Sequence, residues 1–300
     1  MTETDRAPLY FCVDAGATRS RGRLYDASGR PIASAEAGPA NASYDSEQAA
    51  DSLLDLWRHL NAAVDRDPQD LSDVTFAIGG AGLYVQGPRE AFLARGPAFA
   101  AVFVMSDGYA ALIGAGGGRP SALLTIGTGV AGHRLFEDGS SIQRDAWGWI
   151  VGDRGSGSWM GVRAIRHALE VRDGVAAPSA LSAAVMAQIG GVQGLLDGAF
   201  SGLTAHRVAA FALLVLDLAR NGCPVSADIL SRAVAHLADL VGALDCADVP
   251  LYLNGGLAET MKPMLIERIG RPVQDAGSDP LEGCLLVARG KAPPERLATG

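Results

Sequence analysis

The stretch "LYFCVDAGATRSRGRLYD", residues 9–26, decides the expected fold. Its first part is an apolar run that ends in Asp-Ala-Gly, a pattern typical of a buried β-strand followed by a turn. Residues 21–38, "RGRLYDASGRPIASAEAG", then alternate around an Asp-Ala-Ser-Gly turn. We therefore expect the chain to begin with three strands in an antiparallel meander.

Strands and helices alternate beyond this meander. Asp45 and Gln48 form a candidate N-terminal capping pair, and the apolar residues of 50–64 recur behind them at helical spacing. The runs "VTFAIGG" (74–80) and "AVFVMSDG" (101–108) predict two more short strands, and the second is followed by another helix. This order predicts a mixed α/β unit.

A second unit is predicted to begin at residues 121–140, "SALLTIGTGVAGHRLFEDGS". Placing Gly16 on Gly127, 111 residues further on, aligns residues 23–26 with 134–137, and each group precedes a turn of Gly and Ser. The offset indicates two related halves.

We accordingly expect one domain over residues 1–118 and another over 119–300, with a cleft between them. Beyond the second meander the chain is predicted to be mainly helical, at 158–170, 180–189, 206–220 and 226–245. The Pro-rich end, "KAPPERLATG" (291–300), is predicted to be a loose tail.

The composition narrows the range of partners. A net charge of −8 and a pI of about 5.1 argue against nucleic acid and anionic membranes. No apolar run approaches the roughly 20 residues of a membrane span, and the polar start lacks the apolar region of a signal peptide. The four cysteines are scattered without metal-ligand spacing, which indicates reduced thiols and a cytoplasmic protein.

Four glycine-rich loops each follow a short apolar strand: "DAGATRS" (14–20), "IGGAG" (78–82), "IGTGVAG" (126–132) and "NGGLAE" (254–259). Such loops converge at the carboxyl ends of strands in open α/β sheets, where glycine lets backbone N–H groups approach phosphate oxygens. "GTGVAG" matches the dinucleotide fingerprint, but a strand and not a helix is predicted after it. The chain has no GxxxxGK[ST] and no GxSxG sequence, so a P-loop is excluded and hydrolase chemistry has little support.

Residues 146–161, "AWGWIVGDRGSGSWMG", combine three of the four tryptophans with five glycines. This combination suits close backbone approach to a polar ligand with rings lining the site. Together with "DAGATRSRGRLYD", "SDGYAALIGA", "TIGTGVAG" and "LNGGLAE", this segment resembles the five ordered motifs of the N-acetylglucosamine kinase / BadF-type ATPase family, from residue 9 to about 260. The resemblance implies an α/β fold of two ribonuclease H-like (actin-like ATPase) domains with an inter-domain cleft, and ATP and Mg²⁺ as cofactors.

The resemblance also implies roles for single residues. Asp14 would reach Mg²⁺ through water, which agrees with a carboxylate at a strand end, although it could instead only cap a turn. The ATP-binding residues would be Gly16, Thr18, Arg19, Gly127, Thr128, Gly129, Gly255 and Gly256. Asp107 would be the catalytic base and would contact the sugar, with a helix N-cap as the alternative. The other sugar-binding residues would be Asn41, Gly80, Trp147, Gly148 and Asp153, whereas Trp149 and Trp159 are predicted to pack.

The implied function is an ATP-dependent hexosamine kinase acting on the 6-hydroxyl of N-acetylglucosamine or a close amino sugar. Alternatives are a glucosamine kinase, a BadF-type ATPase that activates a radical dehydratase or reductase, and a non-catalytic sugar sensor. Val130 and Arg154 depart from the family pattern, which more often has Ser and Glu there, and this leaves the identity of the sugar open. A homodimer is expected only from the resemblance.

Overall fold

The structure is a computed structural model that describes residues 7–16, 18–41, 45–83, 86–197, 202–277 and 279–296. Its contacts divide the chain into two compact units. The first unit comprises Met1–Leu123, His133–Ile142 and Asp275–Gly300, and the second comprises Leu124–Gly132 and Gln143–Gln274. The sequence-based bounds 1–118 and 119–300 and the cleft stay predictions.

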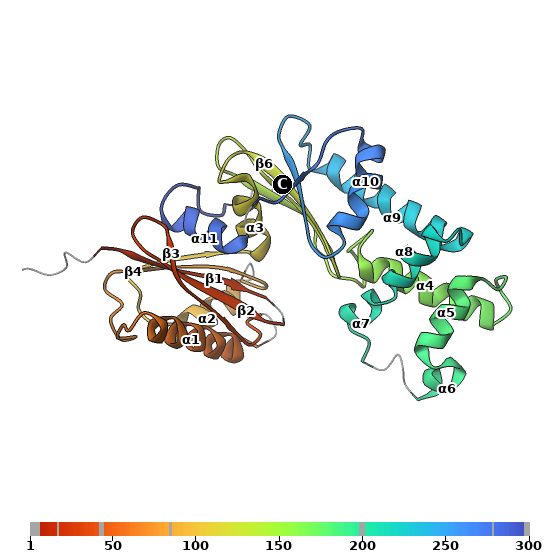
Figure 1. Ribbon diagram of the computed structural model, residues 1–300, viewed down its shortest axis with the longest axis horizontal. Helices are drawn as coiled ribbons and strands as arrows, with labels where there is room; N and C mark the ends of the chain where they lie inside the picture. Colours follow the sequence, from red (N-terminus) through yellow and green to blue (C-terminus); the bar gives the residue numbers. More distant parts are fainter. Residues whose placement is uncertain are drawn as a thin grey trace, which may run out of the picture. The chain divides into compact units, whose positions relative to one another are not determined.

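The first unit contains a five-stranded sheet of order β3-β2-β1-β4-β5 (Figure 1). Strands β1 (Leu9–Ala15), β2 (Ser20–Tyr25) and β3 (Pro31–Ala37) pair antiparallel, which confirms the predicted meander. Strands β4 (Val74–Gly80) and β5 (Ala101–Met105) continue the sheet from β1 in parallel.

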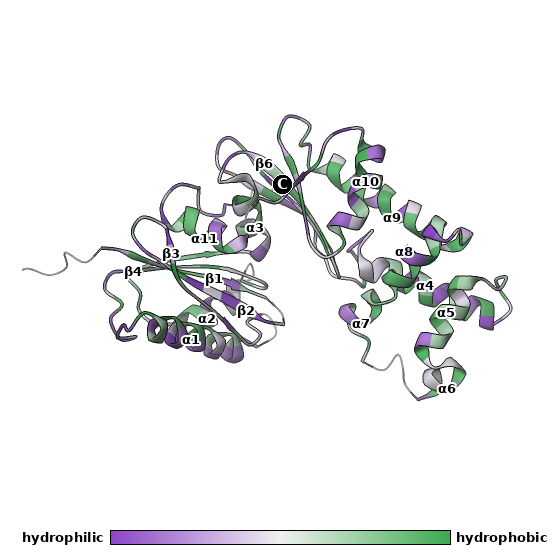
Figure 2. Ribbon diagram, viewed as in Figure 1, coloured by the Kyte–Doolittle hydropathy of each residue, from purple (hydrophilic) through white to green (hydrophobic). Residues whose placement is uncertain are grey.

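Helices cover both faces of this sheet. α1 (Ser46–Ala63) and α2 (Gln86–Arg95) lie on one face, and α3 (Asp107–Gly116) and α11 (Pro280–Ala288) lie on the other (Figure 1). The Asp45 side chain accepts hydrogen bonds from the first turn of α1, as predicted. Hydrophilic residues of α1 face away from the sheet (Figure 2), because its apolar side packs into the core.

The core under α1 is built around aromatic rings. Phe11, Trp57 and Phe76 are almost fully buried, and their ring centroids, with that of Phe99, lie 4.9 to 6.0 Å from a neighbouring ring. Burying one such side chain contributes about 1.5–3 kcal/mol, so this cluster fixes the position of β1, on which Asp14 stands.

A second five-stranded sheet has the order β10-β9-β6-β7-β8. Its strands are β6 (Ser121–Ile126), β7 (Val130–Leu135), β8 (Ser141–Asp145), β9 (Leu251–Asn254) and β10 (Gln274–Asp275). β6 and β7 follow one another like β1 and β2 at the predicted offset. A contact between an arginine and an aromatic ring recurs at equivalent positions. The Arg23 guanidinium lies 5.7 Å from the Tyr25 ring centre, and the Arg134 guanidinium lies 4.5 Å from the Phe136 ring centre.

The remaining helices are α4 (Gly157–Arg172), α5 (Ala180–Ile189), α6 (Gly191–Leu196), α7 (Ala205–Ala209), α8 (Ala212–Arg220), α9 (Pro224–Ala243) and α10 (Ala258–Ile269). Three of the predicted helices agree with α4, α5 and α9 within two residues at each end. The helix predicted at 206–220 is present but interrupted, because the Phe211 N–H bonds to the Val208 carbonyl and this tighter turn separates α7 from α8.

The prediction of a loose tail is also wrong for residues 293–296. The Tyr109 hydroxyl donates to the Pro293 carbonyl (2.9 Å), and the Ser141 N–H donates to the Arg296 carbonyl (3.0 Å). Tertiary hydrogen bonds order this segment although its composition is that of a linker. Residues 297–300 lie outside the described residues.

Within the described residues, no single helix has the length and apolarity needed to cross a membrane. The pair Ala205–Arg220 and Pro224–Ala243, bent by 114°, meets the criterion only when its two parts are taken together.

Candidate active site

The carboxyl ends of β1, β4 and β5 carry the candidate residues of the first unit. The parallel register pairs Asp14 with Gly79, Ala15 with Gly80, and Gly79 with Met105. Asp14, Gly80 and the segment leading to Asp107 therefore stand side by side at one edge of the sheet. The structure brings together here the first two predicted glycine loops and the predicted base.

The turn after β1 requires glycine at position 16. The Gly16 N–H donates to the Arg19 carbonyl (3.1 Å), and a Cβ at Gly16 would lie 2.7 Å from that same oxygen. The Ala40 N–H donates to the Gly16 carbonyl (3.0 Å), which places Asn41 next to this turn. Thr18 and Arg19 are exposed, and Arg19 lies 3.9 Å from Glu36.

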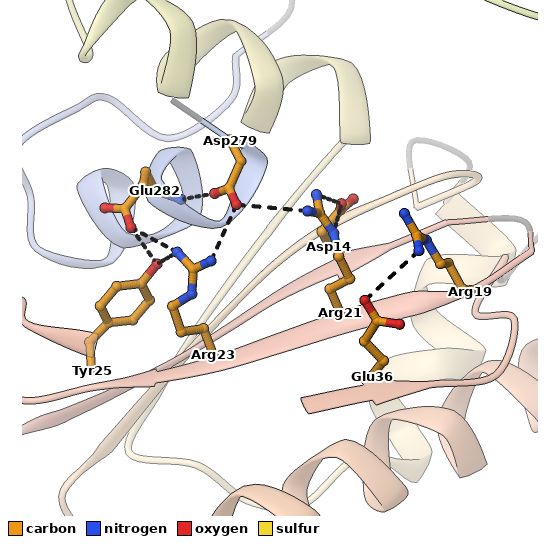
Figure 3. Close-up of polar contacts among 8 residues, drawn as sticks. All are labelled: Asp14, Arg19, Arg21, Arg23, Tyr25, Glu36, Asp279 and Glu282. Atoms are coloured by element: carbon orange, nitrogen blue, oxygen red, sulfur yellow. Dashed lines mark hydrogen bonds and ion pairs between the residues drawn. The ribbon is translucent and has the colours of Figure 1, made fainter. Parts of the chain in front are cut away.

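Asp14 is engaged by an arginine that the sequence analysis did not single out. Arg21 donates to Asp14 Oδ2 from Nη2 (2.6 Å) and Nε (3.2 Å), and its guanidinium also lies 3.8 Å from Asp279 (Figure 3). The Asp14 side chain is 20% exposed, and its Oδ1 makes no hydrogen bond within the described part of the chain. Arg21 on the neighbouring strand, facing Asp14 across the register, was the signal that could have revealed the pair.

The ion pairs continue along the sheet away from Asp14. Arg23 lies 3.3 Å from Asp279 and 3.0 Å from Glu282, and the Tyr25 hydroxyl donates to Glu282 (2.8 Å; Figure 3). Burial raises the pKa of the Tyr25 phenol, and its hydrogen bond to Glu282 adds to that effect. The network ties α11 to β2 and thereby supports the strand that positions Arg21.

Asp107 is the first residue of α3, but it is not the cap of that helix. The N-cap is Ser106, whose Oγ accepts from the Tyr109 N–H (3.1 Å), so the N-cap alternative for Asp107 is wrong. The Asp107 carboxylate accepts from the Gly108 N–H beside it (2.9 Å) and is exposed. Desolvation by the surrounding protein raises the pKa of the Asp107 carboxyl, and the hydrogen bond from the Gly108 N–H lowers it by a smaller amount.

The C-terminal segment holds the residues on either side of Asp107. Glu295 accepts from both the N–H and the hydroxyl of Ser106, each at 2.7 Å, while Tyr109 bonds to Pro293. Partial burial raises the pKa of Glu295, the bonds from Ser106 lower it, and the nearby Asp107 charge raises it. Glu295 is not among the predicted site residues, because its segment has the composition of a linker.

In the second unit, backbone hydrogen bonds assemble the loop Gly127–Gly129. The Gly127 N–H donates to the Gly129 carbonyl (2.9 Å), and the N–H groups of Gly157 and Ser158 donate to the carbonyls of Gly127 (2.9 Å) and Thr128 (3.0 Å). These bonds join the loop to the start of α4.

The loop Gly255–Gly256 lies against the end of β6. Gly255 has a φ of +99°, and a Cβ there would lie 2.4 Å from the Ile126 carbonyl oxygen, so only glycine fits. A Cβ at Gly256 would meet nothing within 4 Å, and one at Gly127 would lie 4.0 Å from the Gly256 nitrogen. Two of the predicted ATP-binding loops therefore adjoin and leave open backbone surface at Gly256.

Asp153 is buried (7% exposed), and hydrogen bonds engage both its side chain and its backbone. Its Oδ1 accepts from the Val130 N–H (3.2 Å), and a Cβ at Gly129 would lie 2.8 to 3.0 Å from its carboxyl group. Asp145 accepts from the N–H groups of Asp153 (2.8 Å) and Arg154 (3.3 Å). Burial raises the pKa of Asp153, the Val130 N–H lowers it, and the Asp145 charge raises it.

Asp145 was missed by the sequence analysis. It and Asp153 both have positive φ, +60° and +54°, in backbone conformations that are unusual without glycine. Strained backbone of this kind clusters at functional sites. Between them, Trp147 is 78% exposed and Gly148 has a φ of +85°. Trp159 is buried, as predicted for a packing residue.

No group of three or more His, Cys, Asp or Glu side chains among the described residues is arranged to hold a metal ion. Asp14 Oδ1 is an oxygen donor of the kind that Mg²⁺ prefers, and a water-mediated contact needs only one such carboxylate. The residues present thus fit a Mg²⁺ that is held mainly by water and nucleotide phosphates.

The chain is similar to known proteins along most of its length. A family model described as the BadF/BadG/BcrA/BcrD ATPase family matches residues 12–288. The chain is 25% identical to "Glucosamine kinase GspK" of Vibrio cholerae over 281 residues, which cover 93% of this chain and 95% of the relative.

Two solved structures share the fold. A "Putative N-acetylglucosamine Kinase" from Chromobacterium violaceum has a TM-score of 0.85 and 28% identity, covering 94% of this chain and 99% of the other. A second protein so described, from Porphyromonas gingivalis, has a TM-score of 0.70 and 18% identity, covering 95% and 100%. The predicted α/β fold of actin-like domains is confirmed.

Proposed function

We propose, from the premise that the chain belongs to the BadF/BadG/BcrA/BcrD ATPase family, that it transfers the γ-phosphoryl group of ATP to the 6-hydroxyl of N-acetylglucosamine or a close amino sugar. The chain is a phosphotransferase of the sugar-kinase type with an alcohol group as acceptor. The observation that carries the proposal is an accessible carboxylate, Asp107, at the end of a strand beside the Asp14–Gly16 turn.

Asp107 is the proposed base. As the bond between the γ-phosphorus and the oxygen shared with ADP breaks, the sugar oxygen bonds to phosphorus and its proton passes to Asp107. Because the hydroxyl keeps its proton until late in such a transfer, the carboxylate mainly orients it. The raised pKa of Asp107 makes its carboxylate a better proton acceptor. The residue is also exposed, so a substrate can reach it.

The glycine turns are the proposed nucleotide site. Gly16, Thr18 and Arg19 would meet phosphate oxygens, as would the loop Gly127–Gly129, and the open backbone at Gly256 would lie against adenosine together with Gly255. Asp14 would hold Mg²⁺ through water from Oδ1. When bound, the Mg²⁺ neutralises charge on the β- and γ-phosphates.

Asn41 and Gly80 are the sugar contacts that we propose in the first unit. Trp147, Gly148 and Asp153 are those that we propose in the second. Only Oδ1 of the buried Asp153 carboxyl accepts the hydrogen bond from the Val130 N–H. The carboxyl is therefore suited to accept a hydrogen bond from a sugar hydroxyl as well. Arg154 beside it disfavours a protonated amine, which supports N-acetylglucosamine over glucosamine. We also propose that the protein is a homodimer, on the ground of its family, and that it is cytoplasmic, on the ground of its scattered cysteines.

The experiment measures the release of ADP from Mg-ATP, first without any sugar and then with one sugar at a time. The sugars are N-acetylglucosamine, glucosamine, N-acetylmannosamine, N-acetylmuramic acid and glucose. We expect stimulation by one amino sugar, with the 6-phosphate as product. Sugar-independent hydrolysis would instead indicate an activating ATPase. Sugar binding without turnover would indicate a sensor and would overturn the proposal.

A further inference from the structure

Cationic side chains gather around Trp159 in the second unit. Trp159 is 5% exposed, and the Arg163 guanidinium carbon lies 3.4 Å from its ring centre. The Arg232 guanidinium carbon lies 5.9 Å from the same ring, and the His236 ring lies edge-on at 5.0 Å. Two helices supply these groups, since Arg163 follows Trp159 by one turn of α4 and His236 follows Arg232 by one turn of α9.

The turn that carries Arg154 packs on the same part of α9. Gly155 has a φ of +90°, and a Cβ there would lie 2.7 Å from the Ala233 carbonyl oxygen and 3.0 Å from Leu237 Cγ. This close approach brings Arg154 within electrostatic reach of His236. Arg166, one turn beyond Arg163, is close enough to act on Arg163.

Few acidic groups balance these charges. Arg163 donates only to the Trp159 carbonyl (3.3 Å) and contacts no carboxylate in the described part of the chain. Arg232 has an exposed partner, Asp228, at 3.6 Å, and Asp239 acts on His236. This local excess of positive charge lies in a chain whose net charge is −8.

The neighbouring cations add to the effect of burial on the pKa values of this cluster. Burial lowers the pKa of Arg163 to about 10, helped by Arg232 and Arg166. Burial lowers the pKa of His236 too, as do Arg154, Arg163 and Arg232, although Asp239 opposes them. The His236 Nδ1 atom is buried without a hydrogen-bond partner. Titratable groups whose pKa is shifted by burial and by neighbouring charges cluster at functional sites.

We infer that the Trp159 cluster, defined as Arg154, Arg163, Arg166, Arg232 and His236, binds an oxyanion, the phosphate or carboxylate of a small metabolite. Guanidinium groups present paired N–H donors that match both anions. A bound anion would relieve the repulsion among the cations. The competing explanation is that Arg163 only packs on Trp159 as a cation–π pair, which needs no ligand.

The test is an NMR titration of the imidazole signals with inorganic phosphate, against chloride at matched ionic strength and with neither ATP nor sugar present. The result therefore does not depend on the proposed kinase activity. His236 is assigned with His236→Gln. We expect a saturable shift and a higher pKa of His236, because a bound anion stabilises the imidazolium.

Arg163→Met and Arg232→Met should each weaken phosphate binding by roughly tenfold or more. Arg172→Met is the matched control on α4, since Arg172 pairs with Asp173 outside the cluster, and it should bind like the parent. Arg232 is exposed, so its variant serves if Arg163→Met does not fold. Competition by N-acetylglucosamine 6-phosphate would identify a phosphate ligand, and competition by N-acetylmuramic acid a carboxylate. No saturable shift, or equal weakening by Arg172→Met, would overturn the inference.

Discussion

Asp107 begins helix α3 and Asp153 lies just before helix α4, and burial raises the pKa of each, but they are held in opposite ways. Asp107 is exposed, and the fixed groups are its neighbours, since Ser106 is bound by Glu295. Asp153 is itself fixed, by Val130 at its carboxylate and by Asp145 at its backbone. An accessible carboxylate on a fixed support suits proton transfer, whereas a fixed carboxylate suits recognition.

Replacing Asp107 should produce the largest effect. Asp107→Asn keeps the size of the side chain but removes the proton acceptor, so we expect turnover to fall by ~10²-fold or more. The KM for the sugar should change little, which ADP-release kinetics would measure. Asp153→Asn should show the reverse, a raised KM with a smaller loss of turnover. Turnover within a few-fold of the parent for Asp107→Asn would contradict the role of Asp107.

Removing the support of Asp153 should come next. Asp145→Ala leaves the N–H groups of Asp153 and Arg154 without their acceptor, and we expect the sugar KM to rise by roughly tenfold, equivalent to about 1.4 kcal/mol. Asp138→Ala is the control, since Asp138 likewise accepts from a turn N–H, that of Ser140 (2.9 Å). It should leave the KM unchanged. Equal effects of the two variants on KM would show that Asp145 acts only on stability.

Loosening the support of Asp107 should have a smaller effect. Glu295→Gln removes an acceptor from Ser106, so we expect kcat to fall by roughly threefold to tenfold with little change in KM. Ser179→Ala, which removes the N-cap of α5, is the control for a general loss of about 1 kcal/mol of stability. If both variants lower kcat alike, Glu295 does not position Asp107.

The smallest effect at neutral pH concerns protonation. Because the pKa of Asp107 is raised, the base becomes protonated, and activity is lost, at a higher pH than for an ordinary Asp of pKa about 3.9. When kcat is measured from pH 8 down to pH 4, it should therefore begin to fall at a pH above that ordinary pKa. In Glu295→Gln, which removes a nearby negative charge, this fall should move to lower pH. An unchanged profile would separate Glu295 from the titrating group.

Local patterns predicted the parts of the site that lie within one strand or turn. Alternation gave the meander, and glycines after apolar runs gave the turns at Gly16, Gly127 and Gly255, because these conformations are set by neighbouring residues. The supporting residues escaped prediction. Ser106 and Glu295 are 189 positions apart, and no periodicity links them. Asp145 acts through the backbone of Asp153. This contact depends on positive φ values at both residues, and the sequence does not reveal such values where the residue is not glycine.

The exposure of Trp147 gives this loop a built-in optical reporter. Trp57 and Trp159 are 3% and 5% exposed, whereas Trp147 is 78% exposed. A solvated indole emits at longer wavelength than a buried one and is readily quenched by acrylamide. The fluorescence lost on Trp147→Phe therefore isolates the signal of the loop, and a blue shift of that signal when a sugar is added would report loop coverage in a protein that carries no dye.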